Sequence, residues 1–148
     1  MAAILVIDDS VAILEWMQEV LSKAGHHVVL ASNGRHGIVS LRKMPIDLVI
    51  TDIYMPEKDG VEIIQYARRA APQVKLVAMS SRPPEHNLFK TAMALGAVGT
   101  LQKPFSEEQL LKAVAAALGA SPRIGKGPIS GAEPASDGVT LPSQRGCA

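Results

Sequence analysis

Acidic side chains close two of the apolar runs in this chain. Asp8 and Asp9 follow residues 3–7, Asp52 ends a second run, and Lys103 follows a third apolar stretch. Short runs rich in branched apolar residues and closed by turn residues are typical of strands buried on both faces. In open parallel sheets, ligands bind outside the carboxyl ends of the strands. We therefore expect three carboxylates and one ammonium to meet at one edge of a sheet.

These residue types favour the chemistry of phosphate. Carboxylates that lie together repel one another unless a cation neutralises them or one takes up a proton. No His or Cys adjoins the acids, which suits Mg²⁺, a hard ion that binds carboxylates, water and phosphate oxygens. A phosphate held by Mg²⁺ could place its other oxygens on Lys103 and on the hydroxyl of Ser80. Asp52 would then be the nucleophile, because an aspartate that attacks phosphorus forms an acyl phosphate.

Each of these residues also has a plainer interpretation. The pair Asp8 and Asp9 could be acids favoured by the positive end of the following helix. Lys103 taken alone is more typical of a solvated loop. The hydroxyl of Ser80, or that of its neighbour Ser81, could cap the next turn. The common register of the acids and the lysine at strand ends favours the phosphate site.

The elements that must hold these residues follow from alternating sequence signals. Apolar runs closed by turn residues predict strands, and apolar residues at helical spacing between caps predict helices. Strands are expected at about residues 3–7, 27–31, 47–52, 74–79 and 99–102. Helices are expected at about residues 10–24, 33–44, 58–72, 85–95 and 106–118. Five strands that alternate with five helices imply right-handed crossovers and a parallel sheet covered on both faces, an α/β fold.

The last predicted helix also marks the end of the folded part. Ser106 and Gln109 match a capping box, and Gly119 is expected to end the helix. Residues 119–148 carry six Gly and four Pro with almost no apolar periodicity, so they cannot bury enough surface to offset the entropy of ordering. We expect one folded domain over residues 1–119 and a disordered tail over residues 120–148.

Composition limits the class of protein. Hydrophobic residues make up 47% of the chain and charged residues 20%, which is typical of a globular protein with a packed core. The net charge of +1 and the absence of a basic block give no indication of a nucleic-acid or membrane surface. The single cysteine, Cys147, excludes a disulfide within one chain. With no signal peptide or membrane span in the sequence, we expect a cytoplasmic location.

The complete set of motifs resembles the receiver domain of bacterial two-component response regulators, over residues 3–118. The motifs are Asp8-Asp9, Asp52 with Met55-Pro56, Asp59-Gly60, Ser80, and Lys103-Pro104-Phe105. The resemblance implies a doubly wound (βα)5 flavodoxin-like fold, a three-layer sandwich with a five-stranded parallel sheet in the order 2-1-3-4-5.

The resemblance also implies a role for each residue of the metal site. Asp52 matches the phosphorylated aspartate, Asp9 the direct Mg²⁺ ligand, and Asp8 the acid that holds a metal-bound water. The backbone carbonyl of Tyr54 would complete the protein ligands.

Two further positions match residues that respond to the phosphoryl group. Ser80 matches the hydroxyl that reorients toward it, and Lys103 the cation paired with it, with the bond from Lys103 to Pro104 in the cis form. Thr100 stands where the family commonly has Tyr or Phe as a switch residue. Because so small a side chain cannot swing a ring behind Ser80, we expect signalling to depend mainly on the loop after the fourth strand and the following helix.

In function, the resemblance implies a stand-alone receiver that takes a phosphoryl group from a histidine kinase or a histidine phosphotransfer protein onto Asp52, in a reaction that needs Mg²⁺. Such a protein catalyses only its own phosphorylation and dephosphorylation, and it signals by contact with a downstream protein. Two alternatives stay open: a receiver that is not phosphorylated and acts as an interaction module, and a receiver fragment of a longer regulator. An aspartate-nucleophile phosphatase of the haloacid dehalogenase type is disfavoured, because its two acids lie two residues apart and these acids are adjacent.

Overall fold

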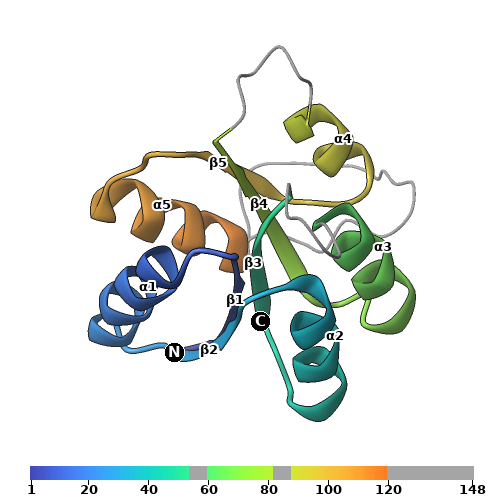
Figure 1. The fold of residues 1–148 in the computed structure, drawn as a ribbon, viewed down its shortest axis with the longest axis horizontal. Helices are drawn as coiled ribbons and strands as arrows, with labels where there is room; N and C mark the ends of the chain where they lie inside the picture. Colours follow the sequence, from blue (N-terminus) through green and yellow to red (C-terminus); the bar gives the residue numbers. More distant parts are fainter. Residues whose placement is uncertain (54–59, 82–87, 120–148) are drawn as a thin grey trace.

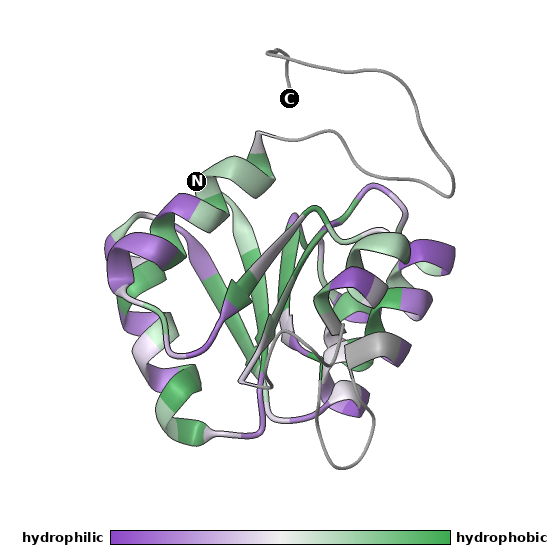
Figure 2. Cartoon of the chain, turned by 90° about the horizontal axis from the view of Figure 1, so that it is seen from above, coloured by the Kyte–Doolittle hydropathy of each residue, from purple (hydrophilic) through white to green (hydrophobic). Residues whose placement is uncertain are grey.

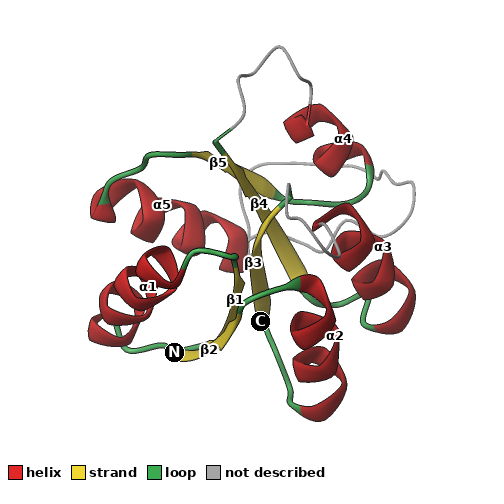
Figure 3. Cartoon of the chain, in the orientation of Figure 1, coloured by secondary structure: helices red, strands yellow, loops and turns green. Residues whose placement is uncertain are grey.

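The computed structural model describes residues 1–53, 60–81 and 88–119. Strands and helices alternate along the chain (Figures 1 and 3). The strands are β1 (Ala3–Ile7), β2 (His27–Ala31), β3 (Leu48–Asp52), β4 (Lys75–Ser80) and β5 (Gly99–Gln102). The helices are α1 (Val11–Lys23), α2 (Gly34–Lys43), α3 (Gly60–Ala70), α4 (Leu88–Ala94) and α5 (Glu107–Leu118). The alternation predicted from the sequence is confirmed.

The five strands form one parallel sheet in the order β2-β1-β3-β4-β5. Every neighbouring pair is parallel, so all the carboxyl ends lie at the same edge. The order reverses direction at β1, because the chain first adds β2 on one side and then β3 on the other. This reversal places the ends of β1 and β3 side by side at the switch point where α/β sheets bind ligands. The predicted strand order and fold class are confirmed.

Two hydrophobic cores lie on the two faces of this sheet. One core packs α1 and α5 against one face, with Met17 and Leu110 fully buried. The other packs α2, α3 and α4 against the opposite face, with Ile63 and Ala92 fully buried. Figure 2 shows the sheet between these layers, with hydrophobic colour along much of its strands. Burial on both faces explains why the central strands read as unbroken apolar runs.

Local signals set the ends of the helices. The hydroxyl of Ser10 accepts a hydrogen bond from the Ile13 amide at 3.3 Å and so caps α1. At α5, Ser106 and Gln109 form both hydrogen bonds of the predicted capping box, and Gly119 is the C-cap. Two strands differ from the prediction by one residue: β3 begins at Leu48, and β4 runs from Lys75 to Ser80. Ser80 belongs to β4 because its backbone stays paired with Gln102 in β5.

Some predictions fall on residues that the structure does not describe. They are the first residues expected for the third and fourth helices, the turn with Met55 and Pro56, and the tail at residues 120–148. The division into a domain at residues 1–119 and a tail therefore stays a prediction.

Candidate functional site

Three carboxylates meet at the carboxyl edge of the sheet. Asp8 and Asp9 directly follow β1, and Asp52 is the last residue of β3. One oxygen from each of the three lies within 4.8 Å of the other two. Asp8 and Asp52 are buried, whereas Asp9 is exposed. The cluster thus has a closed inner side and one acid that faces solvent.

Lys103 reaches this cluster from the end of β5. Its Nζ donates to Asp8 Oδ2 at 2.5 Å and to Asp52 Oδ2 at 2.7 Å. Burial alone would lower the pKa of Lys103, but the hydrogen bonds and negative charges of Asp52 and Asp8 outweigh it and raise the pKa. Lys103 is therefore held as a cation between the two acids.

The backbone around Asp8 fixes the direction of its carboxylate. Asp8 Oδ1 accepts from the Ser10 amide at 2.9 Å, while Oδ2 accepts from Lys103. The amide of Asp8 itself donates to the Ala31 carbonyl at the end of β2, at 3.1 Å. The turn from β1 into α1 thus holds the acid in one orientation, so Asp8 is not merely a solvated acid near a helix start.

The two neighbouring serines differ in burial. Ser80 is 1% exposed and directly follows Met79, the register partner of Asp52. Ser81 is exposed. The Ser80 carbonyl also accepts from the Lys103 amide at 2.8 Å, which joins the two strand ends. Of the two hydroxyls, that of Ser80 therefore belongs to the buried side of the site.

Two other predicted positions have different outcomes. Thr100 lies in β5, half-buried and paired with Ala78 of β4, so no aromatic ring occupies this position. Tyr54 lies outside the described residues, and its predicted role as a carbonyl ligand stays a prediction. The peptide bond from Lys103 to Pro104 is cis, as predicted.

A largely apolar cavity adjoins the lysine. It has a volume of about 530 Å³ and is lined by Ile13, Trp16, Ser81, Lys103, Pro104 and Phe105. The rings of Trp16 and Phe105 lie 5.8 Å apart between centroids and are tilted by 49°. Trp16 belongs to none of the sequence motifs. Only the folded arrangement shows that it lines a cavity next to the acids.

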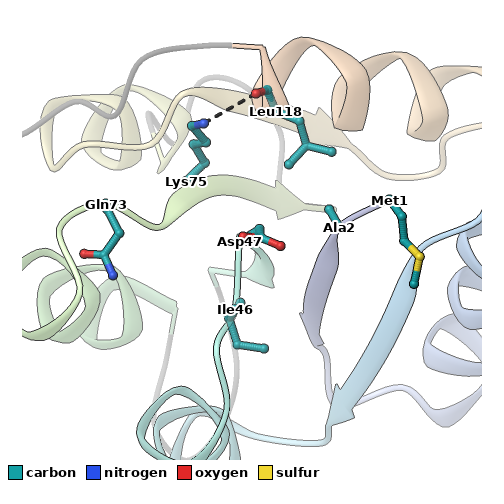
Figure 4. A pocket seen from close by; sticks show the side chains of 7 residues that line it. All are labelled: Met1, Ala2, Ile46, Asp47, Gln73, Lys75 and Leu118. Atoms are coloured by element: carbon teal, nitrogen blue, oxygen red, sulfur yellow. Dashed lines mark hydrogen bonds between the residues drawn. The ribbon is translucent and has the colours of Figure 1, made fainter. Parts of the chain in front are cut away.

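A second pocket lies far from the acids, at the amino ends of the strands. It measures about 370 Å³ and is lined by Met1, Ala2, Ile46, Asp47, Gln73, Lys75 and Leu118 (Figure 4). Lys75 Nζ donates to the Leu118 carbonyl at 3.4 Å across it. Asp47 Oδ2 accepts a hydrogen bond from the Ala3 amide at 2.8 Å. These polar groups join the end of α5 to the start of β4, and the start of β1 to the residue before β3.

The donor set at the carboxyl edge fits a magnesium ion. Its ligands are carboxylate oxygens, the type that Mg²⁺ prefers. Three carboxylates and one ammonium leave two formal negative charges, which a divalent cation would neutralise. The exposed Asp9 offers a ligand on the solvent side, where Mg²⁺ could keep its waters and bind a phosphate oxygen.

One polar residue at this edge has no signal in the sequence. The side chain of Gln102 donates from Nε2 to the Ser80 carbonyl at 3.2 Å and to the Lys103 carbonyl at 3.4 Å. An exposed glutamine at a strand end belongs to no motif, so only the register of β4 and β5 could have revealed it.

Within the part of the chain that the structure describes, no helix has the length and apolar character needed to cross a membrane.

Comparisons with known proteins agree with this geometry. The profile of the response regulator receiver domain matches residues 4–115. The response regulator SaeR of Staphylococcus aureus is 30% identical over 111 residues, which cover 75% of this chain and 48% of SaeR. The chain spans about half the length of the curated relatives it matches.

Solved structures give the same picture. The chemotaxis protein CheY4 of Vibrio cholerae is 31% identical, with a TM-score of 0.73 over 79% of this chain and 98% of CheY4. The response regulator TrrA of Thermotoga maritima, solved in complex with Mg²⁺ and BeF, is 28% identical, with a TM-score of 0.70 over 78% of this chain and 97% of TrrA. With its strand order, its acid cluster and the profile match over residues 4–115, the chain belongs to the family of response regulator receiver domains.

Proposed function

We propose that this protein accepts a phosphoryl group on Asp52 in a Mg²⁺-dependent reaction and uses the modification as a signalling switch. The observation that carries the proposal is the arrangement of Lys103, whose ammonium binds Asp52 and Asp8 inside a three-carboxylate cluster. A buried carboxylate beside a fixed cation and a metal site is what attack on a phosphorus atom needs.

The chemistry divides among the residues of the cluster. Asp8, Asp9 and the carbonyl of Tyr54 would hold Mg²⁺ together with Asp52. When bound, the ion neutralises phosphoryl oxygens. Lys103 would bind a further phosphoryl oxygen, and Ser80 would donate its hydroxyl to another. An oxygen of Asp52 forms the new bond to phosphorus, and the bond from phosphorus to the donor breaks, so that the donor leaves with its electron pair.

The donor class follows from the family. Receiver domains are signalling modules, and SaeR is named a response regulator. We propose a histidine kinase or a histidine phosphotransfer protein as the phosphoryl donor, and a protein as the downstream partner. The modification adds about 1.5 to 2 negative charges at one point. We expect this charge to shift the conformational equilibrium of the loop after β4. Thr100 has no aromatic ring that could move in response.

The test is the intact mass of the protein after incubation with acetyl phosphate. The wild type is expected to gain one phosphoryl group with Mg²⁺ present and none after chelation. Asp52→Asn is expected to gain none under either condition. A folded wild type that gains no phosphoryl group, and that also fails to bind beryllofluoride with Mg²⁺, would instead favour an unphosphorylated interaction module.

A further inference from the structure

The side-chain amide of Gln102 links the ends of β4 and β5 beside the acid cluster. Its Nε2 donates to the carbonyl of Ser80 at 3.2 Å and to the carbonyl of Lys103 at 3.4 Å. The Ser80 carbonyl also accepts from the backbone amide of Lys103 at 2.8 Å. The two residues expected to contact a phosphoryl group are therefore joined to each other through one neighbouring side chain.

The register explains why Gln102 can reach these groups. Gln102 pairs with Ser80 across the last rung of the β4 and β5 ladder. Side chains alternate between the faces of a strand. Ala78 packs in the core under α2, α3 and α4, whereas Met79 packs in the opposite core. Ser80 thus shares its face with Ala78, and its partner Gln102 lies on that face too.

The side-chain amide of Gln102 has a donor for each of these two carbonyls. A primary amide nitrogen carries two hydrogens, and Nε2 of Gln102 faces two carbonyl oxygens within hydrogen-bond distance. One of those carbonyls belongs to Ser80, whose backbone sets the position of its hydroxyl. The other belongs to Lys103, whose side chain crosses to Asp8 and Asp52. A single side chain therefore constrains both peptides.

We propose that Gln102 is a positioning residue for the phosphorylation of Asp52, which holds Ser80 and Lys103 in the geometry that receives the phosphoryl group. This inference rests on the function proposed above. These two hydrogen bonds join Gln102 to backbone carbonyls and not to the three carboxylates. Loss of its two donors should therefore slow phosphoryl transfer and leave the affinity for Mg²⁺ almost unchanged.

Two variants separate the donors of Gln102 from its bulk. Gln102→Met keeps the length of the side chain and removes both donors, whereas Gln102→Lys keeps donors at similar reach. Gln18→Met, at an exposed position of α1, is the matched control. The measurements are the rate of phosphorylation by acetyl phosphate at saturating Mg²⁺, the dissociation constant of Mg²⁺ by calorimetry, and the melting temperature.

We expect the loss of the Gln102 donors to lower the phosphorylation rate without lowering the affinity for Mg²⁺. The phosphorylation rate of Gln102→Met falls about fivefold, as expected when weak hydrogen bonds are lost. Its Mg²⁺ dissociation constant stays within about twofold of the wild type. The phosphorylation rates of Gln102→Lys and Gln18→Met also stay within about twofold of the wild type. An unchanged rate in Gln102→Met overturns the inference. So does an equal loss in Gln102→Lys, or a loss of Mg²⁺ affinity that parallels the loss of rate. A wild type that takes no phosphoryl group overturns the proposed function itself and this inference with it.

Discussion

Lys103 occupies its position because two carboxylates share its ammonium. The side chain of Lys103 is 14% exposed, and that of Asp8 is fully buried. Taking a charge out of water costs several kcal/mol unless a partner compensates for it. Each of the two buried acids therefore depends on the lysine, and the lysine on them.

Replacing Lys103 by Met should destabilise the protein when no metal is present. The substitution removes the ammonium that binds the buried carboxylates of Asp8 and Asp52, which costs about 3 kcal/mol in unfolding free energy. Urea denaturation with EDTA measures this loss. Mg²⁺ should restore more stability to Lys103→Met than to the wild type, because the site then carries three formal negative charges in place of two.

The control for this change is Lys112→Met, because Lys112 is exposed on α5. Its unfolding free energy should stay within about 0.5 kcal/mol of the wild type. Equal stabilities for Lys103→Met and the wild type in EDTA would show that the lysine does not neutralise the acids in solution.

His26 makes the folding stability of the protein depend on pH. Its Nδ1 accepts from the Ala2 amide at 3.2 Å. Burial, and then the nearby amino terminus, lower the pKa of His26 below its ordinary value of 6.5. The unfolded chain therefore binds a proton at a higher pH than the folded chain, so this contribution to stability is complete above pH 6.5 and is lost as the pH falls through the folded pKa.

We expect His26→Gln to reduce the loss of stability between about pH 7 and pH 5, a range set by the ordinary histidine pKa. Urea denaturation at several pH values measures the slope. His36→Gln is the control, because His36 is exposed on α2. A slope that is the same in His26→Gln and the wild type would contradict the lowered pKa.

At the scale of elements, the sequence predicts most of what positions the site. All five strands and all five helices are present, because apolar runs and caps are local signals that survive in the fold. The capping box of α5 is an example, since the side chains of Ser106 and Gln109 each accept a hydrogen bond from the backbone N–H of the other. The convergence of the acids with Lys103 follows from a parallel sheet, because it brings carboxyl ends to one edge.

What the sequence could not predict depends on distances between elements. The bridge from Gln102 to Ser80 joins two residues that are 22 positions apart, so it requires the register of β4 and β5. The cavity beside Trp16 requires α1 to face the segment after β5. Neither arrangement leaves a periodic pattern in the chain, so propensities and spacing alone carry no signal for it.

Gly37 is another such contact between elements. It lies in α2, where a Cβ atom would overlap Cδ1 of Ile7 in β1 and come within 3.4 Å of Ile63 Cδ1. Ile7 and Ile63 are fully buried. The absence of a side chain at Gly37 therefore lets α2 approach the sheet closely.

We expect Gly37→Ala to lower the unfolding free energy by about 1 to 2 kcal/mol, because overpacking costs more than the helix gains from alanine. Ile7→Val removes the methyl group that blocks the new Cβ, so the double variant should be more stable than the sum of the two single losses predicts. Gly119→Ala, whose Cβ would make ordinary contacts, is the control. Additive losses in Gly37→Ala and Ile7→Val would contradict this contact.

At the scale of the whole molecule, the two helix layers face different parts of the site. The layer of α1 and α5 borders the cavity with Trp16 and Phe105, whereas the face with Ser80 and Gln102 belongs to the layer of α2, α3 and α4. Asp52 lies at the end of a central strand between these layers. We therefore expect a charge added at Asp52 to affect both layers through the ends of β3, β4 and β5.

Metal binding should stabilise the whole domain through this site. If Mg²⁺ binds the folded acids and not the unfolded chain, a concentration of 100 times the dissociation constant adds about 2.7 kcal/mol. Asp9→Asn should lose most of this gain and keep its stability in EDTA, because Asp9 is exposed. Thermal unfolding with and without Mg²⁺ measures both quantities.

The control for the metal is Glu15→Gln, which removes an exposed acid of α1 away from the cluster. It should retain the full gain from Mg²⁺. Equal gains in Asp9→Asn and Glu15→Gln would mean that the stabilisation comes from screening of charge and not from the cluster.

The central claim is that Asp52 carries the phosphoryl group. The most direct measurement is to treat the protein with acetyl phosphate and Mg²⁺, reduce the acyl phosphate with borohydride, digest the chain and sequence the peptides by mass spectrometry. We expect conversion of Asp52 to homoserine in the wild type, none in a sample without Mg²⁺, and none at Asp8 or Asp9 in any sample. Conversion at Asp8 or Asp9, or equal conversion without Mg²⁺, would contradict the assignment of Asp52 as the nucleophile in a metal-dependent site.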